Sequence, residues 1–488
     1  MKVLFVASEA YPLIKTGGLA DVAGSLPPAL ARLRVDVRLL LPAYGEVLVG
    51  LEAMRFSAGL DINGEWVRIL HTRLPGSRTQ VWLVDHPLFS ARMGNPYLDA
   101  DGEPWPDNGE RYLLFCQAAA RIAQNEAGLD WQADLVHAND WQTGLIPALL
   151  SAQGSAIPTL FTIHNLAYQG NFGHDLFVKS GLPASYWSPE GVEFYDQISF
   201  MKAALYYARL ITTVSPSYAE EIQTVEFGSG FDGLLSFRQQ DLCGVLNGID
   251  RHEWNPASDK HLPANYRRDR LAGKARAKAA LQKEMKLKQN PDALLIGMVG
   301  RLVEQKGVDV VLEALPELLQ RNVQLAMLGN GAAEFEAAFA QAAAEHRGRV
   351  VFHPGYNEGL AHRIEAGADV FLMPSRFEPC GLNQLYSLRY GTLPIVHGVG
   401  GLADTVVHAS ATSLADGTAT GIVMKELDPA AILAAIDESL ALYADKAQWR
   451  QLMQTAMAQD YSWARSAEEY RALYQRALEA PVLKAALP

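Results

Sequence analysis

The sequence predicts an α/β protein built from two doubly wound parallel-sheet domains. Short apolar runs rich in β-branched residues alternate with longer helical segments almost throughout, which is typical of parallel sheets covered on both faces. At 488 residues the chain is too long for one ordinary core. A glycine-rich turn with the letters GGLAD follows an expected strand in each half, at residues 17–21 and 400–404. The two halves are therefore expected to be Rossmann-like domains facing one another across a deep cleft.

Each half contributes its own set of expected strands and helices. In the first half, strands are expected at residues 3–7, 35–41, 67–74, 80–85, 135–137, 159–163, 210–214 and 242–246, with helices at 111–127 and 201–208. In the second half, strands are expected at 294–299, 324–328, 350–353, 370–373, 393–396 and 422–424, with helices at 308–320, 332–344 and 360–366. In such sheets ligands bind at the carboxyl ends of the strands.

The turn signal Asn247-Gly248-Ile249-Asp250 and the polar, proline-containing residues 255–260 mark the boundary between the domains. We therefore predict an N-terminal domain at 1–246, an interdomain linker at 247–256 and a C-terminal domain at 257–459. Residues 460–488 are expected to form a helical segment that crosses back to the N-terminal domain.

Composition narrows the classes of function. The net charge of −12 argues against a general nucleic-acid-binding protein. Three widely spaced cysteines are typical of a reducing compartment and exclude a disulfide framework. The N-terminus lacks a signal-peptide pattern, and no window approaches a membrane span. The protein is therefore expected to be cytoplasmic, with no membrane partner; the sequence does not predict its oligomeric state.

Residues 15–22 are the first candidate ligand site. Gly17 and Gly18 allow close approach of an anion to backbone N–H groups at a helix start, and Lys15 adds a mobile positive charge. The segment matches neither GxGxxG nor GxxxxGK[ST]. The alternative for such a turn, considered alone, is a solvated lysine beside a strand-to-helix connection.

Two further clusters follow expected strands in the second half. Arg301 and Lys306 could clamp a diphosphate, because cations near a helix N-terminus oppose its dipole unless an anion lies between them. Glu378 follows the strand at 370–373 in a turn that also contains Cys380. A solvated pair of cations and a solvated glutamate are the alternatives.

Together these segments resemble the bacterial and plant glycogen and starch synthase family. The resemblance covers nearly the whole chain and rests on KTGGLADV (15–22), HANDW (137–141), FTIHNLAYQG (161–170), LNGID (246–250), GRLVEQKG (300–307), PSRFEPCGLNQLY (374–386), YGTLPIV (390–396) and GGLADTV (400–406). It implies a GT-B fold and a retaining transferase that moves α-glucose from ADP-glucose to the non-reducing 4-hydroxyl of an α-1,4-glucan. The domain at 1–246 is then the acceptor and catalytic domain, and the domain at 257–459 is the nucleotide-sugar-binding domain. ADP-glucose is then a substrate, glycogen is the acceptor, and no cofactor is expected.

The resemblance also implies roles for individual residues. The catalytic set is Glu378, His164, Arg301 and Lys306. The nucleotide and phosphates are assigned to Lys15, Gly17, Gly18, Arg301, Lys306, Tyr356, Gly381, Leu382 and Asn383. The glucose or the acceptor is assigned to Asp21, Tyr97, Asp140, Asn165, Asn247 and Cys380. Without the resemblance, His164 would be a core histidine, Asp140 a helix cap and Tyr356 a loop aromatic.

The expected mechanism is attack on the same face of the sugar. Many relatives of this fold carry a second glutamate eight positions after the first, where this chain has Tyr386, so no nucleophile for a double displacement can be assigned. No metal site is expected either: the histidines lack HxxxH and HExxH spacing, and the DxD pattern at residues 99–101 is interpreted as a solvated turn.

Three rival functions remain open on the sequence. A transferase of the same fold could use UDP-glucose or another acceptor. A glycogen phosphorylase would need a lysine-bound pyridoxal cofactor and is disfavoured. A glycan-binding protein without turnover is the rival from another class, although Lys15, Arg301, Lys306 and Glu378 are all present.

Overall fold

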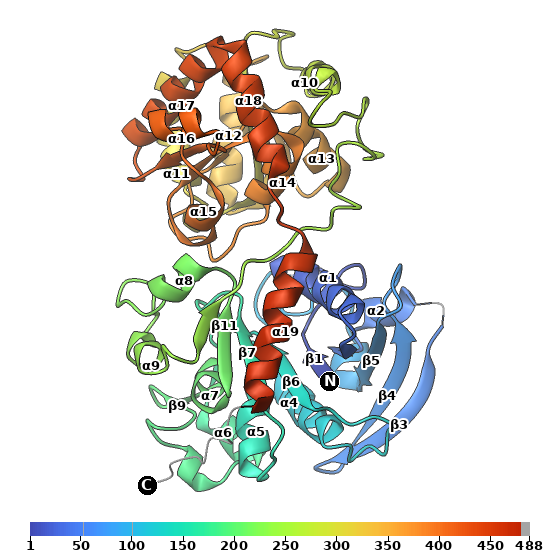
Figure 1. The fold of residues 1–488 in the computed structure, drawn as a ribbon. Coiled ribbons are helices and arrows are strands. Elements are labelled where there is room, and N and C mark those ends of the chain that lie inside the picture. Colours follow the sequence, from blue (N-terminus) through green and yellow to red (C-terminus); the bar gives the residue numbers. More distant parts are fainter. Residues whose placement is uncertain (52, 100, 480–488) are drawn as a thin grey trace. The chain divides into compact units, whose positions relative to one another are not determined.

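The computed structural model describes residues 1–51, 53–99 and 101–479. The chain divides into two compact units (Figure 1): unit 1 is Met1–Gly248 with Trp463–Pro488, and unit 2 is Ile249–Ser462. The division between Gly248 and Ile249 falls inside the segment predicted as the linker. The two units are described separately below.

Unit 1 contains a nine-stranded sheet in the order β12-β11-β7-β6-β1-β2-β5-β4-β3. Its strands are β1 (Lys2–Val6), β2 (Asp36–Pro42), β3 (Arg55–Ile62), β4 (Glu65–Arg73), β5 (Gln80–Asp85), β6 (Leu135–Asn139), β7 (Thr159–Ile163), β11 (Leu210–Thr213) and β12 (Leu242–Gly244). From β12 to β5 all pairings are parallel. The central strands β6 and β7 are fully buried, as expected for a sheet covered on both faces.

One edge of this sheet departs from the expected parallel arrangement. β4 pairs antiparallel with both β5 and β3, and β3 was not predicted. The residues between β3 and β4 are Asn63 and Gly64, with φ of 54° and 89°. Such a two-residue turn makes a hairpin, and the six residues between β4 and β5 are too few for a parallel crossover.

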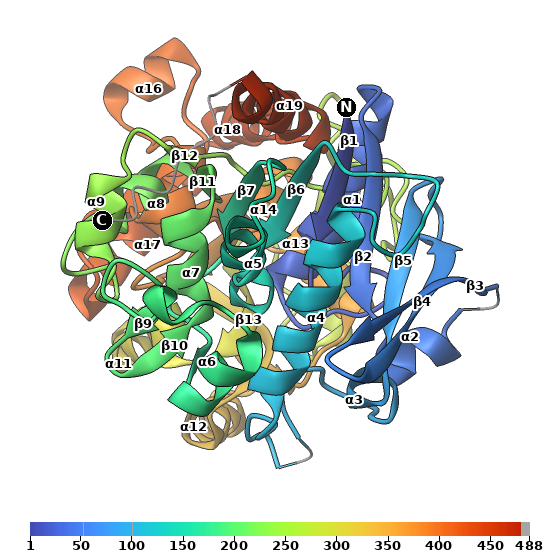
Figure 2. The same ribbon diagram turned by 90° about the horizontal axis from the view of Figure 1, so that it is seen from below.

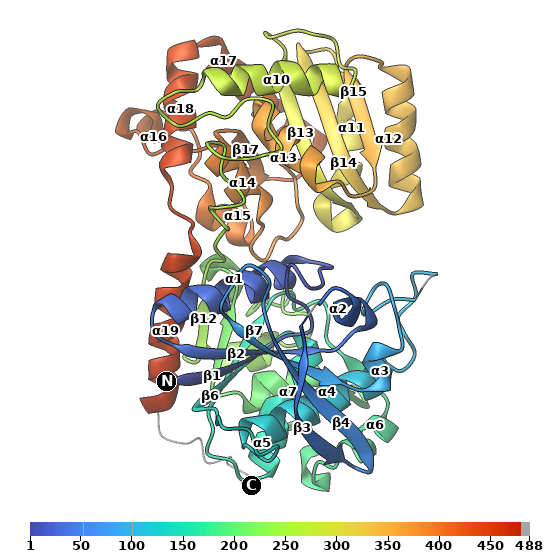
Figure 3. The ribbon, with the colours of Figure 1, turned by 90° about the vertical axis from the view of Figure 1, so that its right-hand side faces the viewer.

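Helices cover both faces of the unit 1 sheet (Figures 2 and 3). α1 (Gly18–Arg32) and α19 (Trp463–Glu479) pack side by side on one face, whereas α4 (Asn108–Ala123), α5 (Ile146–Ala152) and α7 (Phe200–Tyr207) pack together on the other. The hydroxyl of Tyr474 in α19 lies 2.7 Å from Nδ1 of the buried His137 in β6. The last described helix is therefore part of unit 1.

Shorter elements complete unit 1. They are α2 (Gly45–Val49), α3 (Pro87–Ser90), η1 (Trp141–Thr143), β8 (Asn171–Phe172), α6 (His174–Ser180), η2 (Ala184–Tyr186), β9 (Glu193–Phe194), β10 (Gln197–Ser199), α8 (Pro216–Glu221) and α9 (Asp232–Phe237). β8, β10 and β9 form a small antiparallel sheet that the sequence analysis did not predict.

Unit 2 contains a six-stranded parallel sheet in the order β15-β14-β13-β16-β17-β18. Its strands are β13 (Leu294–Leu302), β14 (Val323–Gly331), β15 (Val350–Pro354), β16 (Val370–Met373), β17 (Leu393–His397) and β18 (Ile422–Met424). The prediction of a doubly wound parallel sheet is confirmed here, although β13 and β14 each extend three residues further than expected.

Two apolar cores lie on opposite faces of this sheet. One joins it to α11 (Val308–Leu318), α12 (Ala333–Glu345), α17 (Pro429–Ala444) and α18 (Lys446–Ala458), and the other joins it to α10 (Ala272–Glu284) and α13 (Glu358–Gly367). α14 (Asn383–Tyr390), α15 (Gly400–Thr405), α16 (Ala411–Asp416) and η3 (Glu304–Lys306) complete the unit. No described helix has the length and apolar character needed to cross a membrane.

Candidate functional site

In unit 2 the candidate site lies at the carboxyl ends of three neighbouring strands. β13, β16 and β17 are adjacent, so the segments that follow them meet at the same edge of the sheet. Arg301 is the penultimate residue of β13, Lys306 lies in η3, and Glu378 lies in the connection between β16 and α14. This edge therefore gathers the cations and the carboxylate that the sequence analysis singled out.

Glu378 is a buried carboxylate held by several groups. Its side chain is 8% exposed, and its Oε2 accepts hydrogen bonds from Lys306 Nζ and, at 3.0 Å, from Ser375 Oγ. Its backbone carbonyl accepts the N–H of Gly401 at 3.1 Å. The Lys306 ammonium neutralises this carboxylate, which would otherwise be costly to bury.

A cavity of about 80 Å³ opens beside this pair and brings together three of the predicted residues. Arg301, Lys306 and Asn383 all line it, together with other residues of β13, the end of β16 and the two residues that follow β16. Asn383 is the first residue of α14, and its Nδ2 donates to the Val299 carbonyl at 2.7 Å. The side-chain amide of Asn383 therefore links α14 to β13. One of its N–H groups is used in this bond and does not serve a ligand in the cavity.

Glycines shape the connections around Glu378 because no side chain fits there. Gly307 has φ of +65°, and a Cβ on it would lie 1.9 Å from the Pro374 carbonyl oxygen. A Cβ on Gly401 would lie 2.2 Å from the Cys380 carbonyl oxygen. The second GGLAD turn is thus needed for close packing onto the Glu378 connection.

The other residues predicted in unit 2 lie outside that cavity lining. Cys380 is buried, Gly381 has φ of +72°, and Leu382 caps the start of α14. Tyr356 lies in the loop between β15 and α13 and is 68% exposed. Its ring is accessible, as stacking on a planar ligand would require.

In unit 1 the predicted phosphate loop leads into α1. Gly17 is the N-cap and Gly18 the first helical residue, and a Cβ on either would meet no atom within 4 Å. These glycines are therefore not required by packing, unlike Gly401, and the space beside them lets a ligand approach the start of α1 closely. Lys15 Nζ lies 2.9 Å from Asp21 Oδ1 and over the ring of Tyr11.

Glu9 holds this loop in place, and the sequence analysis missed it. The side chain is 3% exposed, and Oε2 accepts the N–H of Thr16 at 2.5 Å and that of Gly17 at 3.4 Å, while Thr16 Oγ1 donates to both oxygens. Burial raises the pKa of Glu9 to about 7, although these donors lower it in part. A glutamate two residues after an expected strand was the signal available in the sequence.

Asp140 and His164 follow the neighbouring strands β6 and β7 and contact each other. Asp140 Oδ1 accepts the backbone N–H groups of His164 at 2.8 Å and Asn165 at 3.4 Å. Burial raises the pKa of Asp140 to about 7 and lowers that of His164 to about 3. The His164 ring is therefore neutral, and its Nε2 lies 3.0 Å from Asn139 Oδ1. Asp140 is not the helix cap that its position alone suggested, since its side chain makes no capping bond to η1.

Tyr97 belongs to the same group of residues. Its hydroxyl lies 2.7 Å from Ser8 Oγ, and burial together with the charges of Glu9 and Asp140 holds its pKa well above the usual range. Asn247, near the end of the first part of unit 1, is 6% exposed, and its Oδ1 has no hydrogen-bond partner among the described residues.

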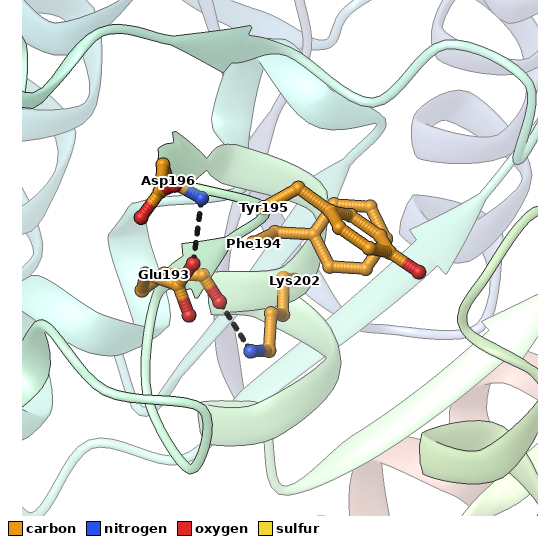
Figure 4. A pocket seen from close by; sticks show the side chains of 5 residues that line it. All are labelled: Glu193, Phe194, Tyr195, Asp196 and Lys202. Carbon is orange, nitrogen blue, oxygen red and sulfur yellow. Dashed lines mark hydrogen bonds between the residues drawn. The ribbon is translucent and has the colours of Figure 1, made fainter.

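Two other features of unit 1 contain no predicted site residue. An open hollow of about 300 Å³ is lined by Glu193, Phe194, Tyr195, Asp196 and Lys202 (Figure 4). In the DxD segment, Asp99 Oδ1 accepts the N–H groups of Asp101 and Glu103, as in a turn, and Ala100 lies outside the described residues.

Two family models and several known proteins match this chain. Residues 2–237 match the starch synthase catalytic domain model, and residues 281–454 match that of glycosyl transferases group 1. Glycogen synthase 1 of Methylococcus capsulatus is 53% identical, with 98% of this chain and 97% of the relative covered. The glycogen synthase of Cellvibrio japonicus is 54% identical, with 97% and 98% covered.

Solved structures give the same result. The catalytic domain of starch synthase IV from Arabidopsis thaliana, bound to ADP and acarbose, superposes with a TM-score of 0.87 at 29% identity, covering 98% of this chain and 99% of that one. Sucrose-phosphate synthase from Thermosynechococcus elongatus, at 18% identity and a TM-score of 0.60, shares the fold.

The fold is that of a glycosyltransferase with the GT-B architecture. Relatives that are about half identical over almost the whole chain then identify the family. The chain belongs to the glycogen and starch synthase family, and its enzymatic class is that of a glycogen synthase.

Proposed function

We propose that this enzyme transfers α-glucose from ADP-glucose to the non-reducing 4-hydroxyl of an α-1,4-glucan, with retention of configuration. The observation that carries the proposal is the Lys306–Glu378 pair beside the cavity at the carboxyl edge of the unit 2 sheet. A cation suited to a diphosphate and a carboxylate suited to sugar hydroxyls lie there in direct contact.

Unit 2 supplies the donor groups in this proposal. Arg301 and Lys306 bind the diphosphate, and the exposed ring of Tyr356 stacks on the adenine. Glu378 accepts hydrogen bonds from glucose hydroxyls once Lys306 has turned to the phosphate. The ADP bound to the starch synthase IV structure supports an adenine nucleotide as the leaving group.

Unit 1 supplies the acceptor and sugar groups. The uncrowded start of α1 at Gly18, with Lys15, adds positive potential toward a phosphate. Asp140 fixes the backbone of His164 and Asn165, so that these residues present a fixed set of donors and acceptors to a sugar. Acarbose in the starch synthase IV structure supports a glucan acceptor.

The reaction proceeds on one face of the sugar. The bond between C1 of glucose and the phosphate oxygen breaks, the acceptor 4-oxygen bonds to C1 from the same side, and its proton passes to the departing phosphate. Positive charge from Arg301 and Lys306 stabilises the leaving diphosphate, where negative charge develops. His164, which is neutral at physiological pH, can donate a hydrogen bond without carrying charge. No cofactor takes part in the proposal.

The test is nucleotide release from ADP-glucose with and without glycogen, beside the same assay with UDP-glucose. We expect glycogen-dependent release of ADP and new α-1,4 linkages by NMR. Glu378→Ala should reduce the rate by roughly 100-fold or more, the usual size of effect for a group that acts in the transition state. Glu334→Ala, an exposed residue of α12, is the matched control and should keep the wild-type rate.

The outcomes separate the rival functions. A preference for UDP-glucose would overturn the donor while leaving the transferase class intact. Glucan binding without release of either nucleotide would favour a binding protein. Full activity of Glu378→Ala would remove this residue from the site.

A further inference from the structure

A cluster of two glutamates and a histidine lies in unit 2 outside the proposed donor site. Glu358 and His362 are one turn apart on α13, and Glu253 belongs to the segment that enters unit 2. One carboxylate oxygen of each glutamate and a ring nitrogen of the histidine lie within 4.8 Å of one another. Nothing in the proposed transfer reaction uses these groups.

The two ring nitrogens of His362 have very different surroundings. Nδ1 lies 2.8 Å from Asp259 Oδ2, and Asp259 also accepts the hydroxyl of Tyr390 at 2.5 Å. Nε2 is buried and makes no hydrogen bond to any described residue; Glu358 Oε1, at 3.6 Å, is beyond normal hydrogen-bond distance. The His362 side chain is 1% exposed, so water cannot freely satisfy this nitrogen.

The rest of the environment fixes the ring. Trp254 stacks on it with centroids 3.8 Å apart, and the other face of Trp254 stacks on Tyr386 at 3.7 Å. A carboxylate that holds one imidazole nitrogen while the other faces acidic groups is the arrangement that orients metal-binding histidines in proteins. The orientation of the ring is therefore set before any ligand binds.

We propose that Glu253, Glu358 and Nε2 of His362 bind a divalent transition-metal ion of the zinc type, with water completing its coordination. Imidazole nitrogen and carboxylate oxygen suit such an ion. Its ligands lie about 2.1 Å from the metal, so the two glutamates, both partly exposed, need to close inward slightly. The ion would join the segment around Glu253 to α13 and would be structural, since its ligands are not those of the donor site.

A proton is the competitor for this position. Burial lowers the pKa of His362, but the carboxylates of Asp259 and Glu358 outweigh burial and raise it to about 9. The metal-free protein thus holds an imidazolium at neutral pH, and the proton on Nε2 is released to solvent when the ion binds. The sequence patterns HxxxH and HExxH could not reveal this site. Only one of its ligands is a histidine, and Glu253 lies far from Glu358 and His362 in the sequence.

The test uses the full-length chain, stripped with EDTA and dialysed against Zn²⁺ at pH 8. We expect one Zn²⁺ per chain by mass spectrometry after gel filtration, a higher thermal midpoint with metal than without, and visible absorption bands when Co²⁺ replaces Zn²⁺. Glu253→Gln and Glu358→Gln should each weaken binding at least tenfold, whereas Glu334→Gln on α12 should not.

Circular dichroism of the metal-free variants confirms that they are folded, so that lost binding is not lost structure. Two results would overturn the proposal. Either the wild-type chain retains no Zn²⁺, in which case the cluster is an ion-pair network around an imidazolium, or all variants retain as much Zn²⁺ as the wild type, in which case the metal is bound elsewhere.

Discussion

At the scale of single residues, the charged groups of unit 1 are tuned by burial. Glu9 and Asp140 both follow strands of the parallel sheet, and burial raises both pKa values to about 7. Each ionised carboxylate accepts backbone N–H groups of a candidate ligand-binding segment: Thr16 and Gly17 for Glu9, and His164 and Asn165 for Asp140. When either carboxylate takes up a proton, the hydrogen bonds that hold its segment in place become weaker.

We predict that Glu9→Gln raises the KM for ADP-glucose roughly tenfold or more, because hydrogen bonds to a charged acceptor are lost from the loop that carries Lys15. The kcat should change less, since Glu9 positions the loop instead of touching the reacting atoms. Steady-state kinetics separate the two constants. The matched control is Glu468→Gln, an exposed residue of α19, and an unchanged KM in Glu9→Gln would show that the loop does not depend on this carboxylate.

The same residues predict a pH dependence. As pH falls through about 7, Glu9 and Asp140 become protonated and lose their acceptor character, so kcat/KM should fall. The charge of Glu9 also contributes to the raised pKa of Asp140. A plot of log kcat/KM against pH should have a steeper acid limb in the wild type than in Glu9→Gln, where one titrating group is gone.

Stability should follow the opposite direction over this range. The pKa of Glu9 rises from 4.5 to about 7 on folding, so the folded state binds more protons than the unfolded state between these values. The free energy of unfolding contributed by Glu9 therefore decreases as pH rises from about 4.5 to 7. Glu9→Gln should flatten this part of the stability profile, and denaturant unfolding at a series of pH values measures it.

At the scale of secondary-structure elements, glycine decides how closely the unit 2 connections pack. Gly307 lies between η3, which carries Lys306, and α11. Its left-handed φ and its contact with the Pro374 carbonyl leave no room for a side chain. The position of Lys306 beside Glu378 depends on this close approach.

We predict that Gly307→Ala lowers the free energy of unfolding of unit 2 by at least about 2 kcal/mol, from left-handed strain and overpacking together. Activity should fall at least tenfold, since Lys306 moves. Gly417→Ala is the matched control: its φ is +68°, but the nearest atom to an added Cβ is Gln451 Nε2 at 3.8 Å. That variant should lose about 1 kcal/mol and stay active. Equal losses in both would contradict the packing argument.

At the scale of the whole molecule, unit 1 is discontinuous in sequence. α19 brings Tyr470 and Tyr474, both fully buried, against β6 and β7. The hydroxyl of Tyr474 is the hydrogen-bond partner of His137 Nδ1, and Nε2 of the same ring lies 2.7 Å from Thr162 Oγ1. Without α19, this face of the sheet would expose apolar surface to water, and the His137 imidazole would lose the hydroxyl that pairs with its Nδ1.

We predict that a chain ending at Ser462 loses the unfolding transition of unit 1 and keeps that of unit 2. Tyr474→Phe should retain both, with the free energy of unfolding of unit 1 reduced by about 1 kcal/mol, the cost of one hydrogen bond. Differential scanning calorimetry measures the two transitions. A normal unit 1 transition in the shortened chain would show that α19 is dispensable.

The sequence by itself determined the alternation of strands and helices, the parallel sheet of unit 2, the parallel part of the unit 1 sheet and the family, because these depend on short windows and contiguous motifs. It also located Arg301, Lys306 and Glu378, which follow buried strands, although their roles stay predictions. The β3–β4 hairpin could have been found from the Asn63-Gly64 turn. Only the tertiary structure revealed the burial of Glu9, the contact of Asp140 with His164 and the position of Glu253 beside His362. Burial and contacts between distant segments depend on packing of the whole unit, which no local pattern encodes.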